Sequence, residues 1–254
     1  MKLIKKTIKF IIGFPKRLSK CAIETYRQLI CSLTWKRKAS ELAKSQSGLQ
    51  LHLGCGDKHF NGMLNCEFRA TKAADMIMDC GNLHRFKDDS VQVIFSHAFF
   101  EHLYKQQQII LLRDCFRVLV SDGMVVFIGI PDFEVIADAY LKKLKGVKGP
   151  VFDLENVYRY SHGNPEMAYD FWLEQLHKSL FDKVYLWKLL KQAGLKNPVM
   201  FNYAYPGEDI PLNLGFIATK DSKELSDKEI KTILEPYKGS IKNMDELLIY
   251  REQL

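Results

Sequence analysis

The sequence lacks the features that would place the protein outside a reducing compartment or within a membrane. Its six cysteines form no CxxC pair and follow no metal-ligand spacing, so neither a disulfide framework nor a cysteine-based metal site is predicted. The longest purely apolar run near the N-terminus, residues 10–14, is far shorter than the ~20 residues that span a bilayer. Lys9 interrupts any signal-peptide core, and no A-x-A-like cleavage site follows. We therefore expect a cytoplasmic protein.

Acidic residues are scarce at one end of the chain. Residues 1–40 contain eleven lysines and arginines but only one acidic residue, Glu24, whereas the remainder holds 26 basic and 29 acidic residues. The formal charge is thus +10 for this segment and −3 for the rest of the chain. The body of the protein is therefore close to neutral, and the basic character belongs to the N-terminal segment.

Helical periodicity runs through this basic segment. Ile4, Ile8 and Ile11 recur at helical spacing with lysines between them, which predicts an amphipathic helix that ends or kinks at Pro15. A second helix is expected over about residues 18–35. The segment either docks on anionic lipid at the inner face of the membrane, or extends into solvent or packs on the domain or a second subunit. Nucleic acid is not an expected partner, because the body adds no further basic stretch.

From Gly48 onward, short apolar runs alternate with helical patterns, which is typical of an α/β fold with a mainly parallel sheet and helices on both faces. The expected strands cover residues 49–53, 64–68, 75–78, 91–96, 124–129, 199–203 and 214–219. The expected helices cover residues 108–120, 133–144 and 182–193, the last with Asp182 as its N-cap and Gly194 after its end. Charged surface helices are expected from residue 226 onward.

A glycine-rich turn, Gly54-Cys55-Gly56, directly follows the first expected strand. Glycine has no Cβ, so a ligand can approach the backbone closely at such a turn. The third glycine of G-x-G-x-x-G is missing, because position 59 is His, and this disfavours a nicotinamide-dinucleotide site. Cys55 is interpreted as a small turn residue without thiol chemistry, since no base or cation adjoins it in the sequence.

Polar side chains end the next three expected strands. Glu67 ends the second strand, where a carboxylate can bind both hydroxyls of a ribose. Asp79 ends the third, placed to accept a hydrogen bond from an adenine amino group, and Ser96-His97 ends the fourth. Ligands of open α/β sheets bind at the carboxyl ends of the strands. Together with the turn, these residues predict a nucleoside site.

Three stretches of the sequence resemble class I S-adenosylmethionine-dependent methyltransferases of the type 11 kind, most closely the bacterial set associated with surface-glycan and lipid modification. They are LHLGCGDKHFNGMLNCEF, DMIMDCGNLHRFKDDSVQVIFSHAFFEHL and LLRDCFRVLVSDGMVVFIGIPD, within roughly residues 49–132, and HKSLFD at residues 177–182 is also similar. The resemblance implies a Rossmann-like sheet with an antiparallel last strand and S-adenosylmethionine as cofactor. It places Gly54 and Gly56 under the methionine portion, Glu67 at the ribose, and Asp79 with the Cys80 backbone at the adenine.

The resemblance also suggests a domain organisation. Residues 1–40 form the basic segment, residues 41–220 the methyltransferase domain with an acceptor-side insertion at 146–178, and residues 221–254 a C-terminal helical extension. Only about eleven positions separate Gly56 from Glu67, so the usual helix between the first two strands is shortened or absent. Glu67 replaces the more usual Asp, and Ser121-Asp122-Gly123 replaces a Pro-Gly-Gly turn.

Catalytic groups are less clear from the sequence. His97 is expected near the transferred methyl group, where it either acts as a general base or lines the pocket. His162 and His177 are second candidates as bases or substrate-orienting groups. Glu101-His102 is interpreted mainly as structural, and no metal is expected. The predicted function is methyl transfer to an oxygen or nitrogen of a small-molecule, glycan or lipid-linked acceptor; the alternative is a non-catalytic binding or scaffold protein.

Overall fold

The computed structural model describes residues 20–45, 48–164, 172–221 and 224–251. Its helices are α2 (Lys20–Ser45), α3 (Lys105–Val118), α4 (Phe133–Leu141), α5 (Leu154–Ser161), α6 (Trp172–Gln175), α7 (Lys183–Ala193) and α8 (Asp227–Leu234). Its strands are β1 (Leu49–Leu53), β2 (Leu64–Glu67), β3 (Met76–Ile77), β4 (Val91–His97), β5 (Leu119–Pro131), β6 (Lys196–Tyr203), β7 (Asn213–Thr219) and β8 (Leu248–Tyr250). The amphipathic helix expected before Pro15 lies outside the described residues.

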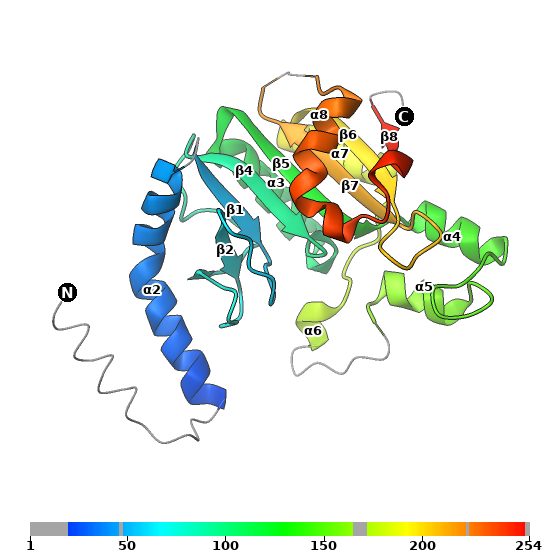
Figure 1. Ribbon diagram of the computed structural model, residues 1–254, viewed down its shortest axis with the longest axis horizontal. Helices are drawn as coiled ribbons and strands as arrows, with labels where there is room; N and C mark the ends of the chain where they lie inside the picture. The colour runs from blue at the N-terminus through cyan, green and yellow to red at the C-terminus, as the bar shows by residue number, and fades with distance from the viewer. Residues whose placement is uncertain (1–19, 46–47, 165–171, 222–223, 252–254) are drawn as a thin grey trace.

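One sheet of eight strands, in the order β3-β2-β1-β4-β5-β7-β6-β8, forms the centre of the protein (Figure 1). The first five strands are parallel, and β7 is antiparallel to both β5 and β6. This arrangement confirms the Rossmann-like α/β sheet with an antiparallel strand near its end. Because β1 to β4 are parallel, their carboxyl ends meet at one edge of the sheet.

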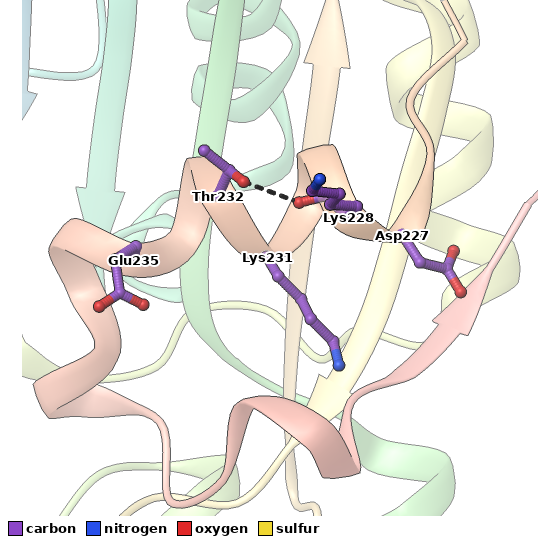
Figure 2. A pocket seen from close by; sticks show the side chains of 5 residues that line it. All are labelled: Asp227, Lys228, Lys231, Thr232 and Glu235. Carbon is purple, nitrogen blue, oxygen red and sulfur yellow. Dashed lines mark hydrogen bonds between the residues drawn. The ribbon is translucent and has the colours of Figure 1, made fainter.

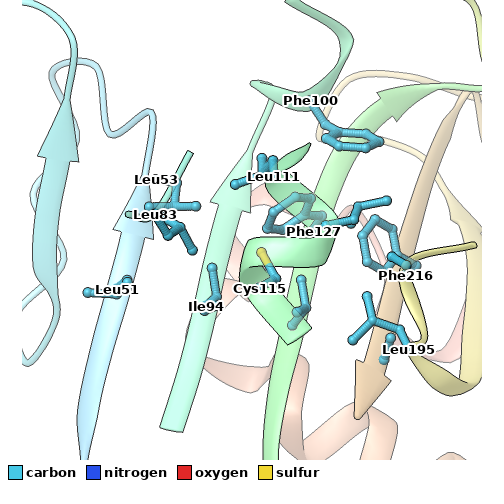
Figure 3. Packing of buried hydrophobic residues seen from close by; sticks show 14 of the residues in the cluster. Leu51, Leu53, Leu83, Ile94, Phe100, Leu111, Cys115, Phe127, Leu195 and Phe216 are labelled. Atoms are coloured by element: carbon cyan, nitrogen blue, oxygen red, sulfur yellow. The ribbon is translucent and has the colours of Figure 1, made fainter. Parts of the chain in front are cut away.

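Alternate residues of the strands build a core on each face of the sheet, as the period of a strand requires. Figure 3 shows one of these cores, in which Leu53, Ile94 and Phe127 of the strands pack against Leu111 and Cys115 of α3. The residues between them, such as Phe95, face the opposite core, which α8 covers. Both faces of the sheet are thus apolar and packed, and this packing fixes the positions of the residues at the ends of its strands.

The helix before β1 ends ten residues later than the sequence pattern predicted. α2 runs to Ser45 and so crosses the expected boundary between the N-terminal segment, residues 1–40, and the domain that begins at residue 41. No proline or glycine interrupts residues 20–45, so nothing stops the helix. Trp35 packs against the core, and Lys38 forms an ion pair with Asp75 beside β3. None of the helices in the described part of the chain combines the length and the apolar character that a membrane crossing requires.

No helix separates β1 from β2, as the short spacing predicted. The connecting loop is held by Asn65 of β2, whose amide group donates to the carbonyls of Phe60 and Met63, both at 3.0 Å. Its oxygen accepts hydrogen bonds from the Phe60 N–H at 2.9 Å and from Nδ1 of buried His52 at 3.0 Å. The hydrogen bonds of this one buried amide therefore hold the loop in place without a helix. None of the described helices covers the turn after β1.

The expectation of surface helices at the C-terminal end is wrong in part. α8 and two short 3₁₀ helices are present, but residues 248–250 form β8, which extends the sheet beside β6. Ile230 and Leu234 of α8 are fully buried, and the ring of Tyr237 stacks on Phe95 at a centroid distance of 3.7 Å. A strand of three half-exposed residues has too short a pattern to be recognised in the sequence. The C-terminal residues are therefore part of the fold.

Candidate active site

A cavity of about 560 Å³ opens at the carboxyl edge of β1 to β4. Seven of the eight residues expected to bind the cofactor line it: Gly54, Cys55, Gly56, Glu67, Asp79, Cys80 and His97. They come from four separate stretches of the sequence, and the parallel strands bring them together.

The turn after β1 has the conformation that its glycines permit. Gly54 and Gly56 have φ values of +65° and +54°, a region that residues with a Cβ seldom adopt. A Cβ on Gly54 would lie 2.6 Å from the ring of Phe99, whereas a Cβ on Gly56 would meet no atom within 4 Å. The backbone at Gly56 is thus open to a ligand in the cavity.

Glu67 stabilises this turn from β2. One carboxylate oxygen, Oε2, accepts a hydrogen bond from the Gly56 N–H at 2.8 Å, and Oε1 accepts one from the Arg69 N–H at 3.1 Å. The Arg69 guanidinium lies 3.3 Å from Oε1. Each carboxylate oxygen can accept two hydrogen bonds, so Glu67 both fixes the turn and keeps acceptor capacity toward the cavity. Its presence as Glu rather than Asp fits this double contact.

Asp79 lies on an exposed loop just after β3, at the cavity rim. Its Oδ1 accepts a hydrogen bond from the Gly81 N–H at 2.8 Å, and its Oδ2 accepts one from the Asn82 side chain at 3.1 Å. These bonds hold the carboxylate in place. The neighbouring thiols are inert: burial, with the nearby Glu67 carboxylate, raises the pKa of Cys55 to about 12, and burial raises that of Cys80 further.

His97 ends β4 and faces the cavity. Its Nε2 is 3.1 Å from the hydroxyl of Tyr205, which follows β6. Burial lowers the pKa of His97 to about 4, so the imidazole is neutral at physiological pH. Gly129 makes this contact possible, because a Cβ there would lie 2.4 Å from the Tyr205 hydroxyl. When that hydroxyl accepts from Nε2–H, Nδ1 keeps a lone pair that can take a proton.

Three candidate residues do not line the cavity. Ser96 is buried in β4, and its hydroxyl donates to the Leu53 carbonyl at 3.1 Å. His162 lies exposed at the end of α5, stacked on Tyr158 at a ring distance of 4.7 Å. His177 is held by the Tyr160 carbonyl, 2.8 Å from its Nδ1, and contacts the ring of His102 instead. The structure therefore brings His97, and neither His162 nor His177, to the cavity wall.

The cavity has further lining residues that were not expected in the site. Lys58 and Arg69 lie in the loops after β1 and β2, Phe99 follows β4, and Lys178 precedes α7. His102, which the sequence analysis interprets mainly as structural, also lines the cavity. Burial lowers the pKa of Lys178. The HKSLFD stretch contains Lys178 and was the one available signal for it. The lining thus carries side chains of both charges as well as aromatic rings.

A second hollow in the surface lies over α8 (Figure 2). Charges of both signs surround it, and its Lys231 pairs with Asp245 at 2.6 Å while Asp227 pairs with Arg251. The Thr232 hydroxyl is bound to the carbonyl of Lys228. All five of its lining residues come from this one helix and the residue after it. None of the residues predicted to bind a ligand lies there. The candidate site is therefore the cavity at the sheet edge.

Comparison with known proteins indicates the class to which the protein is similar. A family model described as a methyltransferase domain matches residues 58–127, a segment that includes Glu67, Asp79 and His97. No curated protein matches the sequence. The matched segment and the topology of the sheet support a methyltransferase, for which S-adenosylmethionine is the implied cofactor.

Two solved structures illustrate the similarity of the fold. A methyltransferase from Archaeoglobus fulgidus that depends on this cofactor is 14% identical with a TM-score of 0.47, and the match covers 76% of this chain and 94% of that one. Another from Thermotoga maritima, described as a possible histamine N-methyltransferase, is 12% identical with a TM-score of 0.45, over 78% of this chain and 94% of that one.

Proposed function

We propose that the protein transfers a methyl group from S-adenosylmethionine to an oxygen or nitrogen of an acceptor that enters the cavity at the sheet edge. The observation that carries this proposal is the meeting of Gly56, Glu67, Asp79 and His97 at one cavity. The open space at Gly56 fits a ligand that lies against the backbone, and the two carboxylates suit hydroxyl and amino donors. The cofactor supplies an electrophilic methyl group on a sulfonium.

The residues of the chain contribute mainly orientation. Glu67 and Asp79 are fixed by backbone hydrogen bonds before any ligand arrives, so little ordering remains to be done on binding. His97 is neutral, so its free Nδ1 can accept a hydrogen bond from the hydroxyl or amino group that attacks, and its lowered pKa makes it a weak base that orients the acceptor more than it removes a proton. Tyr205 positions the His97 ring.

The competing proposal is a non-catalytic binding protein. Because both an enzyme and a binding protein would bind the cofactor, a binding measurement tests the cofactor site but does not distinguish the two. We expect S-adenosylhomocysteine to bind in calorimetry and NAD not to bind. Asp79→Ala removes a charged hydrogen-bond acceptor, worth ~1.5–3 kcal/mol, so affinity should fall about 10- to 100-fold.

The matched control for this variant is Asp122→Ala, because Asp122 is exposed near the amino end of β5, and it does not line the cavity. Its binding should equal that of the wild type. Tight binding of NAD without a response to S-adenosylhomocysteine would overturn the cofactor, whereas equal binding by Asp79→Ala would overturn only the adenine site.

The acceptor is proposed to be a glycan, glycolipid or lipid-linked intermediate at the membrane surface. The basic N-terminal segment supports this, and so does the exposed side of α2, where Leu29 and Leu33 are 51% and 67% exposed, two turns and one turn before Arg37. Apolar side chains beside basic ones on one helix face favour an anionic membrane surface, although Arg37 also pairs with Glu41.

A radiolabelled-methyl transfer assay on cell fractions tests both the turnover and the acceptor. We expect label in the membrane or glycan fraction with wild-type protein and at least a tenfold lower rate with His97→Ala. Label confined to soluble small molecules would contradict the membrane acceptor. Absence of label from every fraction, with intact cofactor binding, would favour the binding protein.

A further inference from the structure

Behind the cavity wall, Glu101, His102 and His177 gather in one cluster. Glu101 and His102 belong to the 3₁₀ turn after β4, and His177 lies in the segment before α7. One ligand atom from each side chain lies within 4.8 Å of the others. The two imidazole rings are 5.0 Å apart at an interplanar angle of 73°.

Both histidines use the same ring nitrogen, Nδ1, to bind a backbone carbonyl. Nδ1 of His102 lies 3.1 Å from the Leu176 carbonyl, and Nδ1 of His177 lies 2.8 Å from the Tyr160 carbonyl. A carbonyl oxygen only accepts, so both Nδ1 atoms carry the proton and both Nε2 atoms keep a lone pair. Metal-binding histidines are commonly oriented in this way, with the second nitrogen donating to a backbone carbonyl.

Glu101 is the unusual member of the cluster. Its side chain is 2% exposed, and among the described residues its Oε2 has no hydrogen-bond partner. Its Oε1 lies 3.8 Å from Nε2 of His102. A buried carboxyl without a partner costs free energy that a bound cation would offset. The buried carboxyl group thus lies beside two imidazole rings and has one unpaired oxygen.

We propose that Glu101, His102 and His177 bind a divalent first-row transition metal ion such as Zn²⁺. Two imidazole nitrogens and one carboxylate oxygen are a donor set that holds such ions and leaves further coordination positions open. Ligand atoms about 2 Å from one ion lie at most ~4 Å apart, so the side chains close in by about 1 Å. His102 also lines the cavity, which places the ion beside it. A contact between the ion and a methyl acceptor would rest on the proposed function; binding of the ion does not.

Zinc titration of the full chain, in the absence of any cofactor, tests the site. The protein carries Cys21→Ser, which removes the exposed thiol, and is first treated with chelator. We expect one equivalent of Zn²⁺ to bind in calorimetry, and binding to weaken by about 100-fold or more in Glu101→Gln and His177→Ala. Co²⁺ should give the visible absorption of a low-coordinate site. His84→Ala, which removes an exposed histidine outside the cluster, should bind as tightly as the unsubstituted protein.

Two results would overturn the proposal. One is failure of the unsubstituted protein to bind Zn²⁺ or Co²⁺, which would leave a hydrogen-bonded cluster with a protonated Glu101. The other is equal binding by Glu101→Gln, a variant of the same shape that remains usable if His177→Ala does not fold. Neither result bears on S-adenosylhomocysteine binding, and loss of that binding leaves the metal measurement intact.

Discussion

Replacing Gly54 by Ala is expected to weaken S-adenosylhomocysteine binding by at least about 100-fold. The new Cβ would lie 2.6 Å from the ring of Phe99, and Phe99 forms part of the cavity wall. The φ of +65° adds ~1–2 kcal/mol of backbone strain for a residue with a Cβ. Overpacking against the ring adds ~1–3 kcal/mol. Relief of both requires the turn or the ring to move into the cavity, so the loss appears in the calorimetric dissociation constant.

Gly207→Ala is the matched control for this variant. Gly207 has a φ of +96°, but a Cβ there would meet no atom within 4 Å, and the residue does not line the cavity. The free energy of unfolding of Gly207→Ala should fall only by the cost of the backbone strain, and its affinity for S-adenosylhomocysteine should stay unchanged. An unchanged affinity in Gly54→Ala, in protein that is still folded, would place the cofactor elsewhere.

Replacing Asp132 by Ala is expected to lower the free energy of unfolding by ~3–5 kcal/mol. Asp132 is fully buried after β5, where Oδ2 accepts from Asn202 at 2.8 Å and lies 3.3 Å from Nζ of Lys183. Its Oδ1 caps α4 by accepting from the Glu134 N–H at 3.1 Å. The variant removes the hydrogen-bond acceptor of the buried Asn202 side-chain amide. It also leaves the exposed Glu134 carboxylate as the remaining ion-pair partner of Lys183. Urea unfolding measures the loss.

Asp153→Ala separates the cap from the buried ion pair. Asp153 caps α5 by accepting from the Asn156 N–H at 3.1 Å, but its carboxylate is exposed. Loss of such a cap costs ~1 kcal/mol. If Asp132→Ala lowers the free energy of unfolding by no more than Asp153→Ala does, the buried contacts of Asp132 with Asn202 and Lys183 contribute nothing beyond the cap of α4.

The parallel part of the fold and the cofactor side of the cavity are predictable from the sequence, because both follow from local pattern. An apolar run that ends at a glycine turn or an acidic residue identifies both a strand and its carboxyl end. Parallel pairing then places Gly54, Glu67, Asp79 and His97 at one edge without further information. Ser96 does not line the cavity, for an equally local reason: successive side chains of a strand alternate between the two faces of the sheet, so Ser96 and His97 point in opposite directions.

Contacts between distant segments are not predictable in this way. The meeting of His97 with Tyr205 depends on how β6 ends, and that of His102 with His177 depends on an irregular stretch without periodicity. The burial of Glu101 cannot be predicted from the sequence either, because an acidic residue followed by a histidine is also typical of the start of an exposed helix. Tertiary packing decides all three.

The strand order has a consequence for the protein during its synthesis. β1 to β5 emerge from the ribosome first, and their parallel pairing needs only one another and α3. The outer edge of β5 stays unpaired until β7 has been made, and β7 follows α4 to α7 and β6 in the sequence. Until that point, an apolar strand stands unpaired beside an open half-sheet, the arrangement most prone to wrong pairing with another chain. Newly made protein is therefore most vulnerable to aggregation while residues 132–212 are being translated.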